Sequence, residues 1–149
     1  MHIKQQIHAH YIDVINSKIL MLQQTLADLK ESGSNETKST AGDKHETALA
    51  MLQIEQANTR VQLQEALEQR SVLVTIDPDI ITKKVLPGSY VKTNKGNFYI
   101  SVALGKLIIG AESIMAISPQ SPLGAKLMRS CINDTVTINT NNYFIESIE

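Results

Sequence analysis

Two carboxylates in the first half of the sequence are the side chains best placed for chemistry. Asp43 and Glu46 follow Gly42 at the predicted start of a helix, where a spacing of three turns both toward one side. Carboxylate oxygens are hard ligands that suit Mg²⁺, and Glu31 and Glu36 lie close by in the sequence. Two carboxylates bind the ion weakly, so a working site needs further ligands from a partner. The same D-x-x-E pattern also fits a helix-capping box, and this structural interpretation stays open.

The other reactive side chains favour structural roles. His8 and His10 would point to different faces of a helix, so they do not chelate a metal together, and we interpret the histidines as solvated surface residues. Cys131 is the single cysteine, which excludes an internal disulfide and a cysteine-based zinc site. It follows a predicted helix end and does not lie at a helix N-terminus, so we expect a structural thiol and not a nucleophile. Ser121 before Pro122 is typical of a helix N-cap rather than a nucleophile.

Composition narrows the class of protein further. The 149 residues suit one or two small domains, and a net charge of -1 gives no global attraction to nucleic acid or an anionic membrane. Aromatic residues make up 4% and Trp is absent, which disfavours an aromatic-lined ligand pocket. Apolar runs stay well short of the roughly 20 residues that span a bilayer. We therefore expect a cytoplasmic monomer that makes no membrane contact.

The composition changes sharply near Arg70. Residues 1–70 contain no Pro and only two of the seven glycines, and they are rich in helix formers. Residues 71–149 contain all four prolines and are rich in Val, Ile, Thr and Asn. This change predicts two domains, 1–70 and 71–149.

The first half predicts an antiparallel pair of helices of about 28 residues each, or about 42 Å. Apolar residues of the first helix follow the 3-4-3-4-3 spacing of a coiled-coil seam. A polar tip loop over 32–42 separates it from the second helix, predicted over 43–70. The second helix offers two neighbouring seams, which predicts a buried face that is broad or that rotates along the helix. The first-helix seam is Ile12, Ile15, Ile19, Leu22, Leu26 and Leu29; the second-helix seams are Leu49, Leu52, Thr59, Leu63 and Ala66, and Ala50, Ile54, Ala57 and Val61.

The second half predicts an antiparallel sheet with one short helix that begins at Ser121 and Pro122. The chain as a whole is therefore predicted to be α+β, with a helical hairpin followed by a β-rich domain. The expected strands are 71–76, 89–93, 98–104, 107–109, 113–117, 134–140 and 143–148.

Several short motifs resemble those of the bacterial Gre-type transcript cleavage factors. I-S-P-Q-S-P-L-G at 117–124 is similar to the I-S-x-x-S-P-[IL]-[GA] segment of that family, and D-T-V-T-I at 134–138 to its D-x-V-x-[IV] strand. Val85, Gly88 and Val91 resemble its V-x-x-G-x-x-V strand. At the tip, G-D-K-H-E-T-A at 42–48 resembles G-D-L-x-E-N-A.

This resemblance implies an FKBP-like C-terminal domain and an accessory factor of RNA polymerase rather than an enzyme. The coiled coil would enter the secondary channel of the polymerase, and nucleic acid would be met only through the elongation complex. Asp43 and Glu46 would be the catalytic and metal-binding pair, holding a Mg²⁺ ion shared with the polymerase and stimulating transcript cleavage in backtracked complexes. Two alternatives with the same fold are a non-cleaving polymerase-binding regulator and a protein like the nucleoside diphosphate kinase regulators. A prolyl isomerase is disfavoured, because fold analogy alone does not carry an activity.

Overall fold

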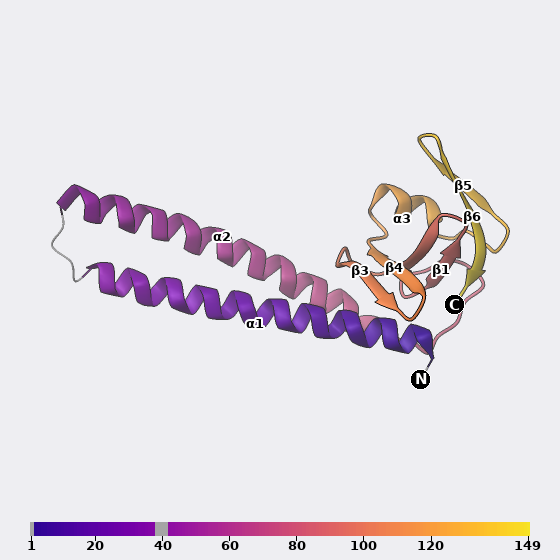
Figure 1. The fold of residues 1–149 in the computed structure, drawn as a ribbon, viewed down its shortest axis with the longest axis horizontal. Coiled ribbons are helices and arrows are strands. Elements are labelled where there is room, and N and C mark those ends of the chain that lie inside the picture. The colour runs from indigo at the N-terminus through magenta and orange to yellow at the C-terminus, as the bar shows by residue number, and fades with distance from the viewer. Residues whose placement is uncertain (1, 38–41) are drawn as a thin grey trace. The chain divides into compact units, whose positions relative to one another are not determined.

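The structure is a computed structural model that describes residues 2–37 and 42–149, with the side chains of 35–45 left out of the description. It confirms the predicted α+β class: two long helices precede a six-stranded sheet with one short helix (Figure 1). The described chain forms two compact units, one of residues 15–70 and one of residues 1–14 together with 71–149. The elements are α1 (Ile3–Thr37), α2 (Gly42–Thr75), β1 (Tyr90–Thr93), β2 (Gly96–Ile100), β3 (Gly105–Ile109), β4 (Glu112–Ile117), α3 (Pro122–Leu127), β5 (Thr135–Ile138) and β6 (Asn141–Ile148).

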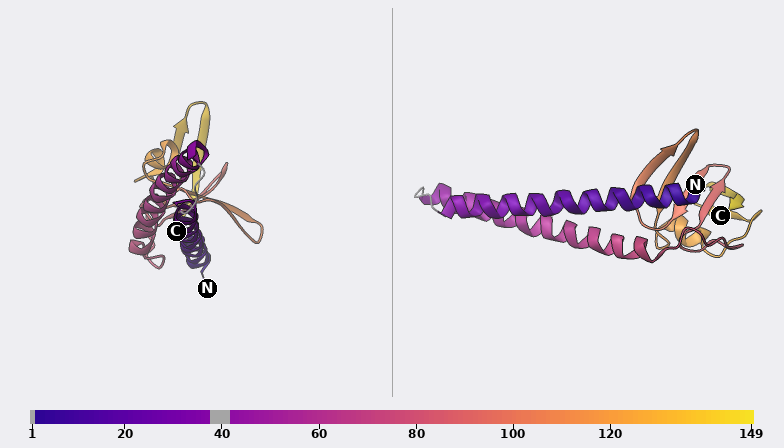
Figure 2. Two further views of the ribbon diagram at one scale, coloured as in Figure 1. Left: turned by 90° about the vertical axis from the view of Figure 1, so that its left-hand side faces the viewer. Right: turned by 90° about the horizontal axis from the view of Figure 1, so that it is seen from below.

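The unit of residues 15–70 is an antiparallel helical hairpin, as predicted, but it lacks residues 1–14 of the predicted range 1–70 (Figures 1 and 2). The predicted seam of α1 is buried at Ile15, Ile19 and Leu22, because residues three and four apart share one face of a helix. Thr59 and Ala66 of α2 are buried as well, as the first predicted seam of that helix requires. Polar contacts join the two helices: Gln56 Nε2 donates to Leu29 O at 3.2 Å, and Arg70 Nη1 to Asn16 Oδ1 at 3.3 Å.

Both helices are longer than predicted, and the predicted strand 71–76 is wrong. Helix α1 continues to Thr37 through most of the expected tip loop, and α2 begins at Gly42 and continues to Thr75. The first strong helix breaker after Arg70 is Pro78, which disfavours helical backbone at the residue before it. The β-branched residues before that point cost a helix only a few tenths of a kcal/mol each, so an existing helix extends through them.

The prediction that the buried face of α2 is broad or rotates along the helix is also wrong. Its second seam, Ala50, Ile54, Ala57 and Val61, is exposed throughout. Each of two packed helices buries one stripe of residues against the other. The first seam of α2 forms the buried stripe of that helix, so the second seam faces solvent.

The sheet has the strand order β3-β4-β2-β1-β6-β5. Four of its pairings are antiparallel as predicted, but β2 and β4 are parallel, so the all-antiparallel prediction is wrong at this place. After β2 the chain crosses to the edge of the sheet as β3, and β4 folds back into the gap between them. Two antiparallel turns in succession therefore leave β4 running in the direction of β2.

The sheet is covered on both faces, which explains why three consecutive residues of β2 are buried. Phe98 and Ile100 point to one face and join a core that includes Leu127 of α3. Tyr99 points to the other face, where its ring stacks on Tyr11 of α1 with centroids 6.1 Å apart. The other buried residues of the core around Phe98, Ile100 and Leu127 are Val85, Val91, Ile145 and Ile148.

Candidate functional site

The hairpin tip carries the predicted pair of carboxylates. Asp43 and Glu46 both belong to α2, so their spacing of three puts them on neighbouring turns of one side of that helix. Glu46 is exposed, as a residue that is to reach a partner's metal site must be. The side chains of Asp43, Glu36 and His45 lie outside the described residues, so the geometry of the pair stays a prediction.

The structural interpretation of this pair changes in one respect. Helix α2 begins at Gly42, so Asp43 lies within its first turn and does not precede it as the predicted N-cap would. A carboxylate in the first turn still interacts favourably with the positive end of the helix dipole. Among the residues that the structure describes, no three His, Cys, Asp or Glu side chains gather in a way that could hold a metal ion.

His2, His8, His10 and Cys131 belong to the β-rich unit and differ in burial. His8 is half-buried rather than solvated, because its Nδ1 lies 2.8 Å from the Tyr99 hydroxyl, whereas His2 and His10 are exposed as predicted. Burial lowers the pKa of His8, and the nearby Asp77 opposes that shift. Cys131 is half-buried beyond the end of α3, and its N–H donates to Asp134 Oδ2 at 2.8 Å.

The I-S-P-Q-S-P-L-G segment has a structural explanation at its second serine and its glycine. Ser121 is the N-cap of α3, as predicted: its Oγ accepts from Gly124 N at 3.0 Å and donates to Ser118 O at 2.7 Å. A Cβ added to Gly124 would lie 2.0 Å from Ser118 O, so no larger residue fits there. Pro122 stands at the first helical turn, where its missing N–H costs nothing.

The first turns of α1 pack within the β-rich unit and were not predicted to do so. Ile7 and Tyr11 are fully buried, and Tyr11 Oη donates to Gly105 O at 2.8 Å. Gln5 Nε2 donates to Asp79 Oδ1 in the segment after α2. Lys4, Ile7 and Tyr11 follow the spacing of one helix face, which could have predicted this packing. The charged residue at position 4 made that face look less apolar than it is.

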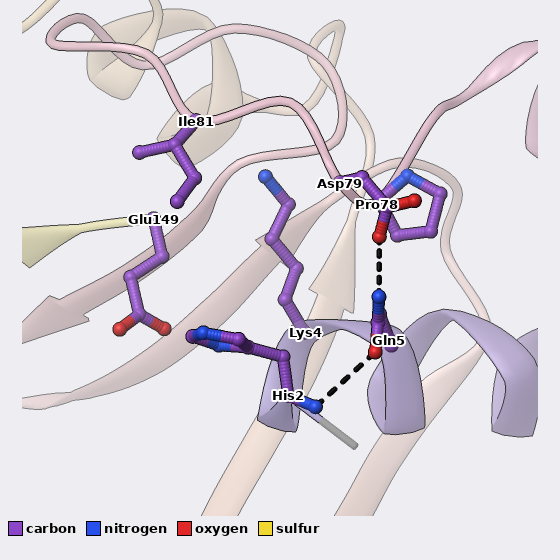
Figure 3. Close-up of a pocket in the computed structure, with 7 residues that line it drawn as sticks. All are labelled: His2, Lys4, Gln5, Pro78, Asp79, Ile81 and Glu149. Carbon is purple, nitrogen blue, oxygen red and sulfur yellow. Dashed lines mark hydrogen bonds between the residues drawn. The ribbon is translucent and has the colours of Figure 1, made fainter.

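That lysine, Lys4, is the most unusual side chain of the unit. It is 3% exposed, and its ammonium donates to Ile80 O. Burial lowers the pKa of Lys4, while Glu149, Asp77 and Asp79 act in the opposite direction. Figure 3 shows Lys4 extending from α1 toward the segment that carries Pro78, Asp79 and Ile81, with His2 and Glu149 beside it.

Known proteins resemble this chain in structure and not in sequence. No protein-family model matches the chain, and no curated protein matches it. Among solved structures, the fold is similar to one described as the structure of the transcription factor Gfh1. The two share 15% sequence identity with a TM-score of 0.40, and the match covers 92% of each chain. This is a likeness in structure, and we argue the function from the chain's own residues.

None of the described helices combines the length and the apolar character that crossing a bilayer demands.

Proposed function

We propose that this protein is an accessory factor of RNA polymerase that acts through the secondary channel. The observation that supports the proposal most directly is the order of its parts. A two-helix hairpin carries the exposed Glu46 near its turn, and a β-rich unit follows with the I-S-x-x-S-P-L-G and D-x-V-x-I motifs. This order and these motifs are those of the Gre-type factors that the sequence resembles.

The hairpin suits delivery of a small group to a recessed site. Within the hairpin of residues 15–70, α1 contributes residues 15–37 and α2 contributes residues 42–70, which are about 35 Å and about 43 Å long at 1.5 Å per residue. A narrow two-helix rod of this length passes where a globular domain does not. The protein on its own would then have no activity, because its two tip carboxylates need further ligands from the polymerase.

The donor set at the tip fits Mg²⁺. Asp43 and Glu46 offer hard carboxylate oxygens on one side of α2, and the carboxylate of Glu46 is exposed to a partner. The two residues would hold the ion together with ligands of the polymerase. When bound, the ion would supply an activated water for hydrolysis of an RNA phosphodiester bond.

The test compares transcript cleavage with polymerase binding. Glu46→Gln and Asp43→Asn remove a charge but keep the side-chain shape, so each should abolish stimulated cleavage in a backtracked elongation complex and leave polymerase affinity unchanged. Glu55→Gln is the matched control, because Glu55 is an exposed glutamate of the same helix away from the tip. Equal cleavage by all four proteins would show that the tip carboxylates only begin a helix.

A non-cleaving regulator is the second candidate, and the tip sequence favours it. Lys44, Thr47 and Ala50 stand where the family motif and the A-E-Y after it have Leu, Asn and Tyr. A protein of this kind would occupy the channel without completing a metal site. Binding to the polymerase without cleavage by the unaltered protein would establish this second function.

A further inference from the structure

The buried ammonium of Lys4 has fewer partners than its chemistry demands. A lysine ammonium carries three N–H donors, and in the described part of the chain Ile80 O is the one acceptor bonded to Lys4. Glu149, Asp77 and Asp79 act on it electrostatically, yet none forms an ion pair with it. A buried charge that is only partly hydrogen-bonded is costly. Two donors of Lys4 are therefore available to another molecule.

Lys4 lines two cavities. The smaller, of about 70 Å³, is the one in Figure 3, where Oε2 of Glu149 is buried and forms no hydrogen bond with any described residue. The larger, of about 350 Å³, is within the size range of sites that take a small ligand or a large side chain. Its walls are mainly apolar, with the Asp77 carboxylate and several hydroxyl groups among them. Its lining includes Thr75, Ile76, Asp77, Ile80, Leu86 and Pro87.

The surface around the larger cavity carries exposed aliphatic side chains and two carboxylates, and the exposed Lys83 and Lys84 follow in the same segment. Ile80 is 57% exposed, and Ile81 and Leu86 are exposed large aliphatic residues of the same segment. Asp77 and Asp79 are exposed carboxylates four and two positions before Ile81. Clustered exposed apolar residues are one mark of a protein-interaction surface. The carboxylates would attract a basic group and repel an anion.

We propose that this pocket, called the Lys4 pocket here, docks a protein segment that presents a large aliphatic side chain next to a basic one. The aliphatic side chain fills the cavity against Ile76, Ile80 and Leu86. A backbone carbonyl of the segment accepts a hydrogen bond from Lys4, and the basic side chain meets Asp77. This inference rests on the proposed function, because it takes RNA polymerase as the protein that carries the segment.

A purely structural role for Lys4 would have a different consequence. The bond from Lys4 to Ile80 O joins the first turn of α1 to the segment after α2. If that were its whole role, Lys4→Met would change the thermal stability and leave the affinity for a partner unchanged. Docking in the Lys4 pocket predicts instead that residues on its rim change affinity without changing stability.

The experiment measures the affinity of core RNA polymerase for the full chain and three variants. Ile80→Lys places a positive charge at the rim of the Lys4 pocket, where it would repel the basic side chain of the segment and fit its aliphatic side chain poorly. Binding should weaken about tenfold or more, as it does when a central interface residue is changed. Ile108→Lys is the matched control: Ile108 is 65% exposed on β3 of the same unit and does not line the pocket, so its affinity should stay within about twofold. Lys4→Met should weaken binding several-fold, and the melting temperatures of all variants are measured alongside.

Each other outcome overturns a definite statement. Binding of the unaltered protein with equal affinity for all variants overturns the inference but leaves the proposed function standing. No binding by the unaltered protein overturns the proposed function and this inference with it. Lys4→Met that lowers stability without changing affinity assigns Lys4 the structural role and overturns the inference. A homodimer that Ile80→Lys dissociates identifies a second copy as the occupant, and overturns it too.

Discussion

The two compact units bury their apolar residues in opposite ways. In the hairpin of residues 15–70, each helix buries one stripe and exposes the remainder, so Ile19 is buried while its neighbour Leu20 is exposed. In the β-rich unit the sheet is covered on both faces, so adjacent residues such as Tyr99 and Ile100 are both fully buried. A buried residue of the sheet is thus surrounded by more packed atoms than one of the seam. The same substitution should cost more in the sheet than in the hairpin.

The largest effect is expected in the core of the sheet. Ile100→Ala should lower the free energy of unfolding by about 4 kcal/mol, because it leaves a cavity in the core between the sheet and α3 that the surrounding residues cannot fill. Denaturant unfolding followed by circular dichroism measures this change. The exposed Ile108 of β3 provides the control, since Ile108→Ala should cost less than about 0.5 kcal/mol. Equal costs at both positions would contradict the difference in burial.

A smaller effect is expected in the hairpin seam. Leu22→Ala should cost about 2 to 3 kcal/mol, at the lower end for buried leucines, because the helix surfaces on either side are open to water. The loss should be local to residues 15–70. Amide hydrogen exchange checks this: protection should fall along α1 and α2, and remain unchanged in β1, β2 and β6. A uniform loss of protection would show that the two units unfold together.

The sequence predicted these two units with different success. The 3-4-3-4-3 spacing identified the seam, since only a helix brings those residues together. Composition placed the division at Arg70, yet residues 1–14 form one compact unit with 71–149. That grouping depends on long-range contacts such as Tyr11 with Tyr99, which spacing along one helix does not reveal.

The candidate sites were predictable to different degrees. Asp43 and Glu46 stood out because residue type, spacing and a motif agreed. The Lys4 pocket could not be predicted, because its cavity joins the first turn of α1 to a segment more than seventy residues away. The strand predicted at 71–76 was wrong for the same reason, because local β propensity does not report long-range packing. These residues continue α2 to Thr75, and Leu73 in its last turn is fully buried.

The contact between α1 and the sheet should depend on pH. Burial lowers the pKa of His8 in the folded protein, so the folded state binds fewer protons there than the unfolded chain does. Stability from this group is therefore complete above the unfolded pKa of about 6.5, and falls as the pH decreases below it. Melting temperatures between about pH 7.5 and pH 5.5 should show this decline.

Two variants identify the group responsible for that decline. His8→Gln should flatten the pH dependence, while His10→Gln should leave it unchanged because His10 is exposed. The carboxylates add little over this range, since ordinary values lie well below it and the hydrogen bond from Tyr90 lowers the pKa of Glu112 further. The same slope in His8→Gln as in the unaltered protein would exclude His8 as its source.

The smallest effect on the free energy of unfolding is expected on the outer face of α2. There an isoleucine is replaced by alanine, which is the same chemical change as at a seam position, so any difference in cost reflects burial alone. Ile54 is 61% exposed and Ile19 is 3% exposed, although both occupy coiled-coil spacings. Ile19→Ala removes buried surface and should cost about 2 kcal/mol or more. Ile54→Ala removes little buried surface and replaces a β-branched residue with the best helix former, so stability should change by less than about 0.5 kcal/mol, with a small gain the favoured sign. Parallel denaturant curves for the two variants measure the difference. A cost at Ile54 equal to that at Ile19 would mean that the outer stripe is covered in the free protein, for instance by a second copy.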